Sequence, residues 1–138
     1  MIEVTSDRAR IDVEVVHRYL STESYWARGI SRELVERSIE HSLPFAAYDG
    51  DAMIAFARVI TDYATFAYLA DVFVLESHRG RGLSKQLMTA ITNDPRLASL
   101  RRWHLVTRDA QGLYAQFGWE ALDTPERHMQ RVVRNAYS

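Results

Sequence analysis

The chain has 138 residues, no cysteine and a formal net charge of -1 at pH 7. This length suits one domain over residues 1–138, and the lack of cysteine excludes disulfides, thiolate metal sites and a cysteine nucleophile. The near-neutral charge gives no overall attraction to nucleic acid or to an anionic membrane. No apolar run approaches the roughly 20 residues that span a bilayer, and residues 1–10 lack the apolar block of a signal peptide. We therefore expect a cytoplasmic protein without nucleic-acid or membrane partners.

The first elements in the chain are a short strand and two helices. A strand is predicted over residues 2–4. Asp12 suits the N-cap of a first helix, because a short side-chain oxygen there accepts from a free amide of the first turn. Ser31 begins a second helix, and both helices carry apolar residues at helical spacing. Residues 21–30 between the helices lack any periodicity, so we expect a loop.

Three strands are predicted next. Residues 45–48 and 53–61 form a hairpin around an Asp-Gly-Asp turn at 49–51. A longer strand over residues 65–75 is apolar on both faces, which is typical of a strand at the centre of a covered sheet.

The C-terminal part alternates between helices and strands. A glycine-containing loop at 79–84 opens a helix that Asn93-Asp94-Pro95 ends. A strand at 103–107 follows, then a short helix capped by Asp109, and a last strand pair over residues 119–122 and 129–133. The order of elements predicts an α/β fold in which one mixed sheet is flanked by helices.

The strongest local signal is the loop Arg79-Gly80-Arg81-Gly82-Leu83-Ser84 between a strand and a helix. Glycines let the backbone approach a phosphate, and a helix N-terminus supplies unpaired amides and a positive dipole end. The loop therefore suits a pyrophosphate, although an ordinary basic turn has the same pattern. It is neither a Walker loop, which needs Gly-Lys-Ser/Thr, nor a Rossmann fingerprint, which needs three glycines after the first strand.

Two motifs together resemble the GNAT superfamily of N-acetyltransferases. The first is Asp71-Val72-Phe73-Val74 followed by Arg79-x-x-Gly82-x-Ser84, which is similar to the family's Val-x-Val and Arg/Gln-x-x-Gly-x-Gly/Ala. The second is Thr107-x-x-Ala110-x-x-x-Tyr114-x-x-x-Gly118-Trp119. The resemblance implies a GNAT-like single sheet, mixed but mostly antiparallel, and it covers nearly the whole chain.

The resemblance also implies a cofactor site for acetyl-CoA. The strand residues Val72, Phe73 and Val74 should offer backbone groups to the pantetheine arm. The amides of residues 79–84 should hold the pyrophosphate, and Tyr114 should lie near the thioester sulfur as a general acid. The alternative is that Tyr114 is a packed aromatic residue beside Phe117 on the same helix.

The sequence departs from the family pattern at three positions. Ser84 replaces a Gly or Ala, but it is also small. Thr107 replaces an Asn that often contacts the cofactor, so the contact of Thr107 is in doubt. Ala70 replaces the Glu of a Leu-Glu-Asp motif found in diamine acetyltransferases, which weakens any prediction of a diamine substrate.

The acceptor half of the site is less defined by sequence. Asp71 is the acid nearest the cofactor strand and is the candidate base, with the reservation that strand alternation could point it away. Tyr25 and Trp26 in the aperiodic loop and Tyr68 on the strand are candidate substrate-binding residues; the alternative is that Trp26 anchors the loop on the core. No cluster of His, Asp and Glu has metal-ligand spacing, so no metal is expected.

The expected reaction is direct transfer of an acetyl group from acetyl-CoA to a primary amine of a small molecule or peptide. Two alternatives remain open at this stage. One is a catalytically silent CoA-binding regulatory module, and the other is an enzyme that acetylates a protein N-terminus or lysine. Members of the family are often dimers, so the resemblance leaves a homodimer open as well.

Overall fold

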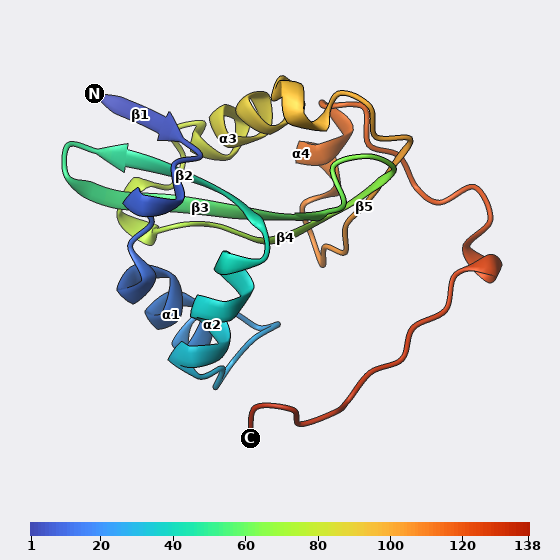
Figure 1. The fold of residues 1–138 in the computed structure, drawn as a ribbon, viewed down its shortest axis with the longest axis horizontal. Coiled ribbons are helices and arrows are strands. Elements are labelled where there is room, and N and C mark those ends of the chain that lie inside the picture. The colour runs from blue at the N-terminus through green and yellow to red at the C-terminus, as the bar shows by residue number, and fades with distance from the viewer.

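One five-stranded sheet organises the whole chain in the computed structural model, which describes residues 1–138. The strands lie side by side in the order in which they occur in the sequence (Figure 1). Neighbouring strands are antiparallel except for the last two, which are parallel. The predicted sheet, mixed but mostly antiparallel, is therefore confirmed. The strands are β1 (Ile2–Thr5), β2 (Leu43–Asp49), β3 (Ala52–Thr61), β4 (Phe66–Val74) and β5 (Arg102–His104).

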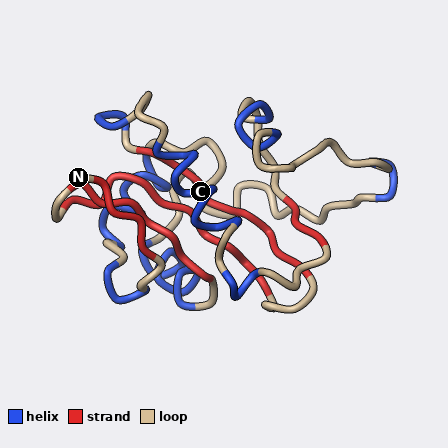
Figure 2. The backbone as a smooth tube through the Cα atoms, turned by 90° about the horizontal axis from the view of Figure 1, so that it is seen from above, coloured by secondary structure: helices blue, strands red, loops and turns tan.

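Helices cover both faces of this sheet. Helices α1 (Val13–Thr22) and α2 (Arg32–Glu40) lie on one face, and α3 (Leu83–Thr92) and α4 (Gln111–Ala115) lie on the other (Figure 1). Figure 2 shows the strands of the sheet from above, where they run side by side. Each face has its own cluster of buried apolar side chains. Two separate cores therefore hold the sheet in place from both sides.

The first two helices begin at the predicted N-caps. The Asp12 carboxylate accepts a hydrogen bond from the amide of Val15, and the Ser31 hydroxyl accepts one from the amide of Leu34. The apolar stripe of each helix is buried against the sheet, at about 1.5–3 kcal/mol for each fully buried large side chain. Caps and stripes together explain why these segments are helical.

Strand β4 contains a β-bulge at the point where the candidate site begins. Phe56 of β3 pairs with Phe73, but Arg58 pairs with Ala70, so β4 has an extra residue between the two pairs. Asp71 lies there with a left-handed φ of 55°. A bulge bends its strand and increases the local twist. The end of β4 is therefore turned away from its neighbour on the other side.

That neighbour, β5, is shorter than the predicted strand over residues 103–107. Only residues 66–68 of β4 pair with residues 102–104 of β5, and after this point the two strands diverge. The prediction was wrong for residues 105–107 because the bulged β4 no longer runs beside them. As a result, residues 69–74 keep one edge of their backbone free of a neighbouring strand.

Two further predictions in the C-terminal part were wrong. Residues 119–122 and 129–133 form no strands, and only a short 3₁₀ turn at Pro125–Arg127 interrupts an irregular course. Asp109 does not cap α4; the Thr107 hydroxyl accepts from the Ala110 amide instead. Gly118, shortly after α4, has a left-handed φ of 88°. No helix in the structure is long and apolar enough to cross a membrane.

Candidate active site

A pocket of about 670 Å³ lies where the end of β4, the start of α3, the helix α4 and the loop after α1 meet. Most of the predicted cofactor residues lie in its wall, and so do two of the predicted acceptor residues. Its lining from the cofactor loop, strand and α4 includes Val72, Phe73, Val74, Arg79, Gly80, Gly82, Leu83, Ser84, Lys85, Ala110, Leu113 and Tyr114. Segments that are distant in sequence thus converge on one cavity.

The loop before α3 presents a run of free backbone amides. The first hydrogen bond of α3 runs from the amide of Gln86 to the carbonyl of Gly82, and none of the amides of residues 80–85 donates to an acceptor in the chain. Gly80 and Gly82 have left-handed φ values of 79° and 74°. Such a turn directs successive N–H groups to one point at a helix N-terminus, where an anion is stabilised.

Arg79 fastens this loop to the rest of the site. Its Nε donates to the carbonyl of Val74 at 3.0 Å, and its Nη2 donates to the hydroxyl of Tyr19 at 3.1 Å. Its own amide donates to the carbonyl of Glu76. The groups of Arg79 are thus engaged with the protein, which makes this residue a support for the loop. Arg81 belongs to the same loop but is not part of the pocket wall.

Tyr114 projects into the pocket from α4 and is 8% exposed. Burial raises the pKa of its hydroxyl above the ordinary value, and the nearby Tyr25 adds to that shift. The hydroxyl is therefore protonated at neutral pH and can donate a proton or a hydrogen bond. Thr107, predicted to contact the cofactor, lies outside the pocket wall, where its hydroxyl accepts from the amide of Ala110.

Aromatic side chains from the loop after α1 form the opposite wall. Tyr25 and Trp26 line the pocket and meet edge to face, with 5.0 Å between ring centroids. The Tyr25 hydroxyl accepts from the amide of Arg108, whose guanidinium lies 4.1 Å from the centroid of the Tyr25 ring. This cation–π contact and hydrogen bond tie the loop to the segment before α4.

Asp71 is held by two partners and lies outside the pocket wall. Its Oδ2 accepts from Arg58 Nε at 2.9 Å, and its Oδ1 accepts from Trp26 Nε1 at 2.7 Å. The side chain is 10% exposed. A carboxylate engaged in this way suits positioning better than proton abstraction. Tyr68 also lies outside the pocket wall, because it is in the part of β4 that pairs with His104 of β5.

Several lining residues had no functional prediction from sequence, among them Tyr19, Arg108 and Glu23. The ring of Tyr19 stacks on Phe73, with centroids 4.1 Å apart, and Tyr19 is on the buried face of α1. Arg108 and Glu23 lie in segments without periodicity, so no pattern singled them out. The Glu23 carboxylate makes no hydrogen bond or ion pair in the chain. It is thus a free negative charge at the pocket.

Comparison with known families gives one model match. The model of the acetyltransferase (GNAT) domain matches residues 40–121. This range includes the bulged strand, the loop with free amides and α4. The matched part is therefore the part that forms most of the pocket.

Comparison with individual proteins points to the same family. A crystal structure from Xanthomonas campestris pv. campestris, provisionally described as an acetyltransferase of the GNAT family, is 48% identical. It covers 100% of this chain and 97% of its own, with a TM-score of 0.97. A Staphylococcus aureus protein of unknown function, provisionally described as an acetyltransferase, is 25% identical with a TM-score of 0.77, over 96% and 99% of the two chains. A Gibberella zeae protein with a similar provisional description is 25% identical over 82% of this chain and 75% of its own.

Proposed function

Because the chain belongs to the GNAT acetyltransferase family, we propose that it transfers an acetyl group from acetyl-CoA to a primary amine of a small molecule or peptide. One observation carries the proposal. The free amides of residues 80–85, the end of β4 and the protonated Tyr114 lie around one pocket. A pyrophosphate, an extended amide chain and a departing thiolate need these three kinds of group.

The amides of residues 80–85 suit the pyrophosphate of CoA. They donate no hydrogen bond to any acceptor within the chain. A Cβ atom at Gly80 or Gly82 would meet no neighbour within 4 Å. The glycines are therefore needed for their left-handed conformation and not for space. Lys85, also in the pocket wall, adds a positive charge beside these amides.

The free edge of β4 suits the pantetheine arm. Residues 69–74 have no strand on the β5 side, so N–H and C=O groups are available there for an extended chain that carries amides of its own. An unpaired amide on the same edge can also donate to the carbonyl oxygen on which negative charge develops during transfer. The bulge at Asp71 therefore creates the space and the hydrogen-bonding groups together.

The chemistry then needs three proton movements. A cationic amine, which the Glu23 carboxylate attracts, first loses a proton to solvent water. The nitrogen lone pair of the neutral amine forms a bond to the carbonyl carbon while the C–S bond breaks, and the thiolate leaves with the electron pair. The nitrogen loses its second proton to water as the amide forms, and Tyr114 supplies a proton or hydrogen bond to the thiolate.

The proposal is tested by two measurements on the same protein. Titration calorimetry should show CoA binding, and a thiol assay should show CoA release from acetyl-CoA with at least one member of a panel of primary amines. Mass spectrometry should then find the amine heavier by one acetyl group. CoA binding without acetylation of any small amine, peptide N-terminus or lysine would favour a regulatory module. Absence of CoA binding would overturn the cofactor site.

A further inference from the structure

Part of the sheet is left uncovered by the helices α1 and α2. Successive side chains of a strand point to opposite faces, and Leu69 of β4 is buried in the cluster on the α3 side. Phe66, Tyr68 and Ala70 therefore point to the α1 and α2 side. Phe66 is 38% exposed there, and Tyr68 and Ala70 are half-buried. This part of β4 leads directly into residues 72–74 of the pocket wall.

Residues of the two neighbouring strands lie on the same face. Ile60 of β3 pairs with Tyr68, and His104 of β5 pairs with Tyr68 from the other side. Ile60 is 40% exposed. The ring of Phe66 meets that of His104 edge to face, with 5.6 Å between centroids. The residues Ile60, Phe66, Tyr68 and Ala70 thus form one surface, here called the apolar stripe.

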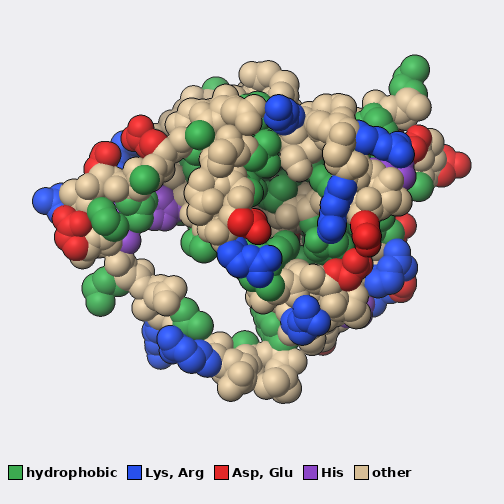
Figure 3. Space-filling model, turned by 180° about the vertical axis from the view of Figure 1, so that it is seen from behind, with side chains coloured by type: hydrophobic (Ala, Val, Ile, Leu, Met, Phe, Trp, Pro, Cys, Tyr) green, Lys and Arg blue, Asp and Glu red, His purple; other side chains and the backbone are tan.

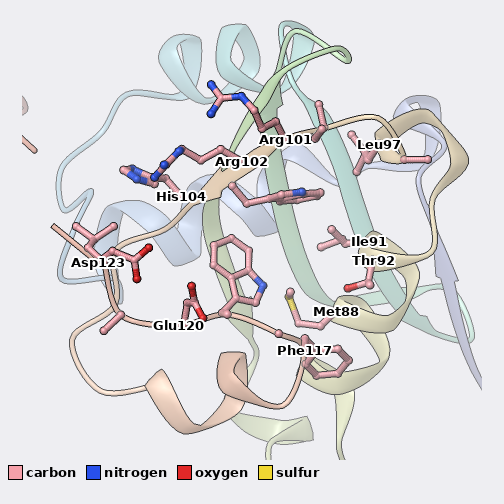
Figure 4. A pocket seen from close by; sticks show the side chains of 17 residues that line it. Met88, Ile91, Thr92, Leu97, Arg101, Arg102, His104, Phe117, Glu120 and Asp123 are labelled. Atoms are coloured by element: carbon pink, nitrogen blue, oxygen red, sulfur yellow. The ribbon is translucent and has the colours of Figure 1, made fainter. Parts of the chain in front are cut away.

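The apolar stripe is separate from a second pocket of about 580 Å³. Met88 and Ile91 of α3 form part of the wall of that pocket, and no residue of the stripe belongs to it. Figure 4 shows the ring of His104 apart from the side chains of Met88 and Ile91, as expected for a residue that points to the other face from Trp103. The stripe and the second pocket therefore lie on opposite faces of the sheet.

Trp26 connects the apolar stripe with the pocket of the candidate active site. Its indole is 41% exposed, lines that pocket and donates to Asp71, the residue next to Ala70. Asp71 also accepts from Arg58, which pairs with Ala70 across the strands. The charges of Asp71 and Arg58 offset each other. The path from the pocket to the stripe therefore presents no unpaired charge among these residues.

The chain itself leaves the apolar stripe open, as the exposure of Ile60 and Phe66 shows. At the far end of the stripe, the ring of His128 lies 5.0 Å from that of His104, between centroids. The residues that follow His128 run away from the body, and Figure 3 shows the open space between them and the body. A row of exposed aromatic and aliphatic side chains is typical of a surface that binds a further molecule.

We propose, on the basis of the function proposed above, that the acceptor is a primary amine with an apolar, preferentially aromatic body, and that this body lies on the apolar stripe. The amine nitrogen enters the pocket beside Val72. The carbon chain behind it passes Ala70, whose small side chain leaves room. Tyr68 is four residues from Val72, about 13 Å along a strand, so a ring on a chain of several carbon atoms reaches the stripe. The rings of Trp26 and Phe66 offer it aromatic contacts.

The observations favour an apolar body over a charged or a polar one. A second ammonium group on the stripe would lose its hydration without gaining a counterion, because Asp71 is already engaged with Arg58. A body with many hydroxyl groups would lack partners, since the side chains of Ile60, Phe66 and Ala70 cannot form hydrogen bonds. The stripe continues the wall of the pocket, so its occupant is the molecule whose amine is in the pocket.

Three amines with the same butyl chain test the class of acceptor. Butylamine, phenylbutylamine and diaminobutane differ only at the far end of the chain. We expect kcat/KM to be on the order of tenfold higher for phenylbutylamine than for butylamine, as half-burial of a phenyl ring would give, and to be lowest for diaminobutane. Equal values, or a preference for diaminobutane, would overturn this inference and leave the proposed acetyl transfer intact. Acetylation of none of the three would also overturn it, and acetylation of no amine in the wider panel would remove the proposed function as well.

Variants of the stripe test where the body lies. The ratio of kcat/KM for phenylbutylamine to that for butylamine should fall roughly threefold in Ile60→Ala and in Phe66→Ala. A loss of folded protein lowers both values, so the ratio reports the contact with the phenyl group alone. Leu122→Ala is the matched control for Ile60→Ala, because both side chains are 40% exposed and Leu122 lines the second pocket; its ratio should not change. An unchanged ratio in both stripe variants would overturn the proposal. If light scattering then showed a changed mass in solution for Phe66→Ala, the stripe would be a contact between copies of the chain.

Discussion

The indole N–H of Trp26 donates to the carboxylate of Asp71 at 2.7 Å, across 45 positions of sequence. Asp71 occupies the bulge of β4 with φ 55° and also accepts from Arg58. One carboxylate thus joins the loop after α1 to the bulged strand β4. This explains why an acid is present at a position where it is neither solvated nor part of the pocket wall.

Asp71→Asn is expected to destabilise the fold. Asn tolerates a left-handed φ, and its amide oxygen can still accept from Trp26, but the charge of the largely buried Arg58 loses its counterion. We expect a loss of about 3 kcal/mol, measured by urea unfolding. Glu33→Gln removes an exposed ion pair with Arg37 and should cost about 1 kcal/mol or less. An equal loss of unfolding free energy in the two variants would show that the ion pair between Asp71 and Arg58 stabilises the fold no more than an exposed one.

Gly82→Ala is expected to weaken CoA binding and to lower stability by about 1–2 kcal/mol, because an L-residue is strained at a left-handed φ of 74°. Calorimetry and urea unfolding measure the two effects. Gly112→Ala is the matched control. Gly112 lies in α4 with nothing near its Cβ position, and alanine there should stabilise by about 0.5–1 kcal/mol. Unaltered CoA binding in Gly82→Ala would argue against the loop as the phosphate site.

Tyr114→Phe should lower kcat by on the order of 10²-fold or more, since a positioned acid contributes at least that much, while CoA binding changes little. Tyr48→Phe is the control. Its hydroxyl is buried without a hydrogen-bond partner, outside the pocket wall, so its removal should leave kcat and stability unharmed. Full turnover in Tyr114→Phe would exclude the acid role.

Tyr114 also predicts a pH dependence of stability. Its pKa in the folded chain is raised by burial, so above a pH of about 10 the unfolded chain releases this proton while the folded chain retains it. Stability therefore falls as pH rises from the ordinary tyrosine pKa toward the raised one. Unfolding curves measured at a series of alkaline pH values should show that the free energy of unfolding falls less steeply with pH in Tyr114→Phe than in the unaltered chain.

Glu23→Gln should raise KM for cationic amines on the order of fivefold, because an exposed charge contributes ~1 kcal/mol, and should leave CoA affinity unchanged. Initial rates at several salt concentrations measure the effect, which salt should reduce. Glu40→Gln, at an exposed position of α2, should change neither value. An equal rise in KM for an uncharged acceptor analogue would contradict electrostatic attraction.

His104 predicts a loss of stability in mild acid. Burial, followed by the charges of His128 and Arg102, lowers its pKa in the folded chain. Below the ordinary value of about 6.5 the unfolded chain takes up a proton that the folded chain resists, so stability falls as pH decreases. The melting temperature should depend less on pH between 7 and 5 in His104→Phe. The exposed His41→Gln should retain the dependence of the unaltered chain.

Local features of the sequence predicted much of this structure. The helix caps at Asp12 and Ser31, the hairpin around Gly50 and the glycine loop all depend on residues within a few positions of one another. Such signals are complete in a short window of sequence. The order of elements and the family resemblance followed from them.

Features that depend on distant segments were not predictable in this way. The shortening of β5 follows from the bulge of a different strand, and the engagement of Asp71 follows from a loop 45 residues earlier. The two predicted C-terminal strands, over residues 119–122 and 129–133, are irregular in the structure. Strand formation depends on a neighbouring strand, and a short window of sequence does not show whether one is present.

Gly29 constrains the C-terminal end of the chain. A Cβ atom at Gly29 would lie 2.7 Å from the carbonyl oxygen of Tyr137, and the φ of Gly29 is left-handed at 85°, so any other residue at this position would push the last residues of the chain away. Gly29 belongs to the loop that carries Tyr25 and Trp26, which line the pocket. The last residues of the chain thus rest against the loop that forms one wall of the pocket.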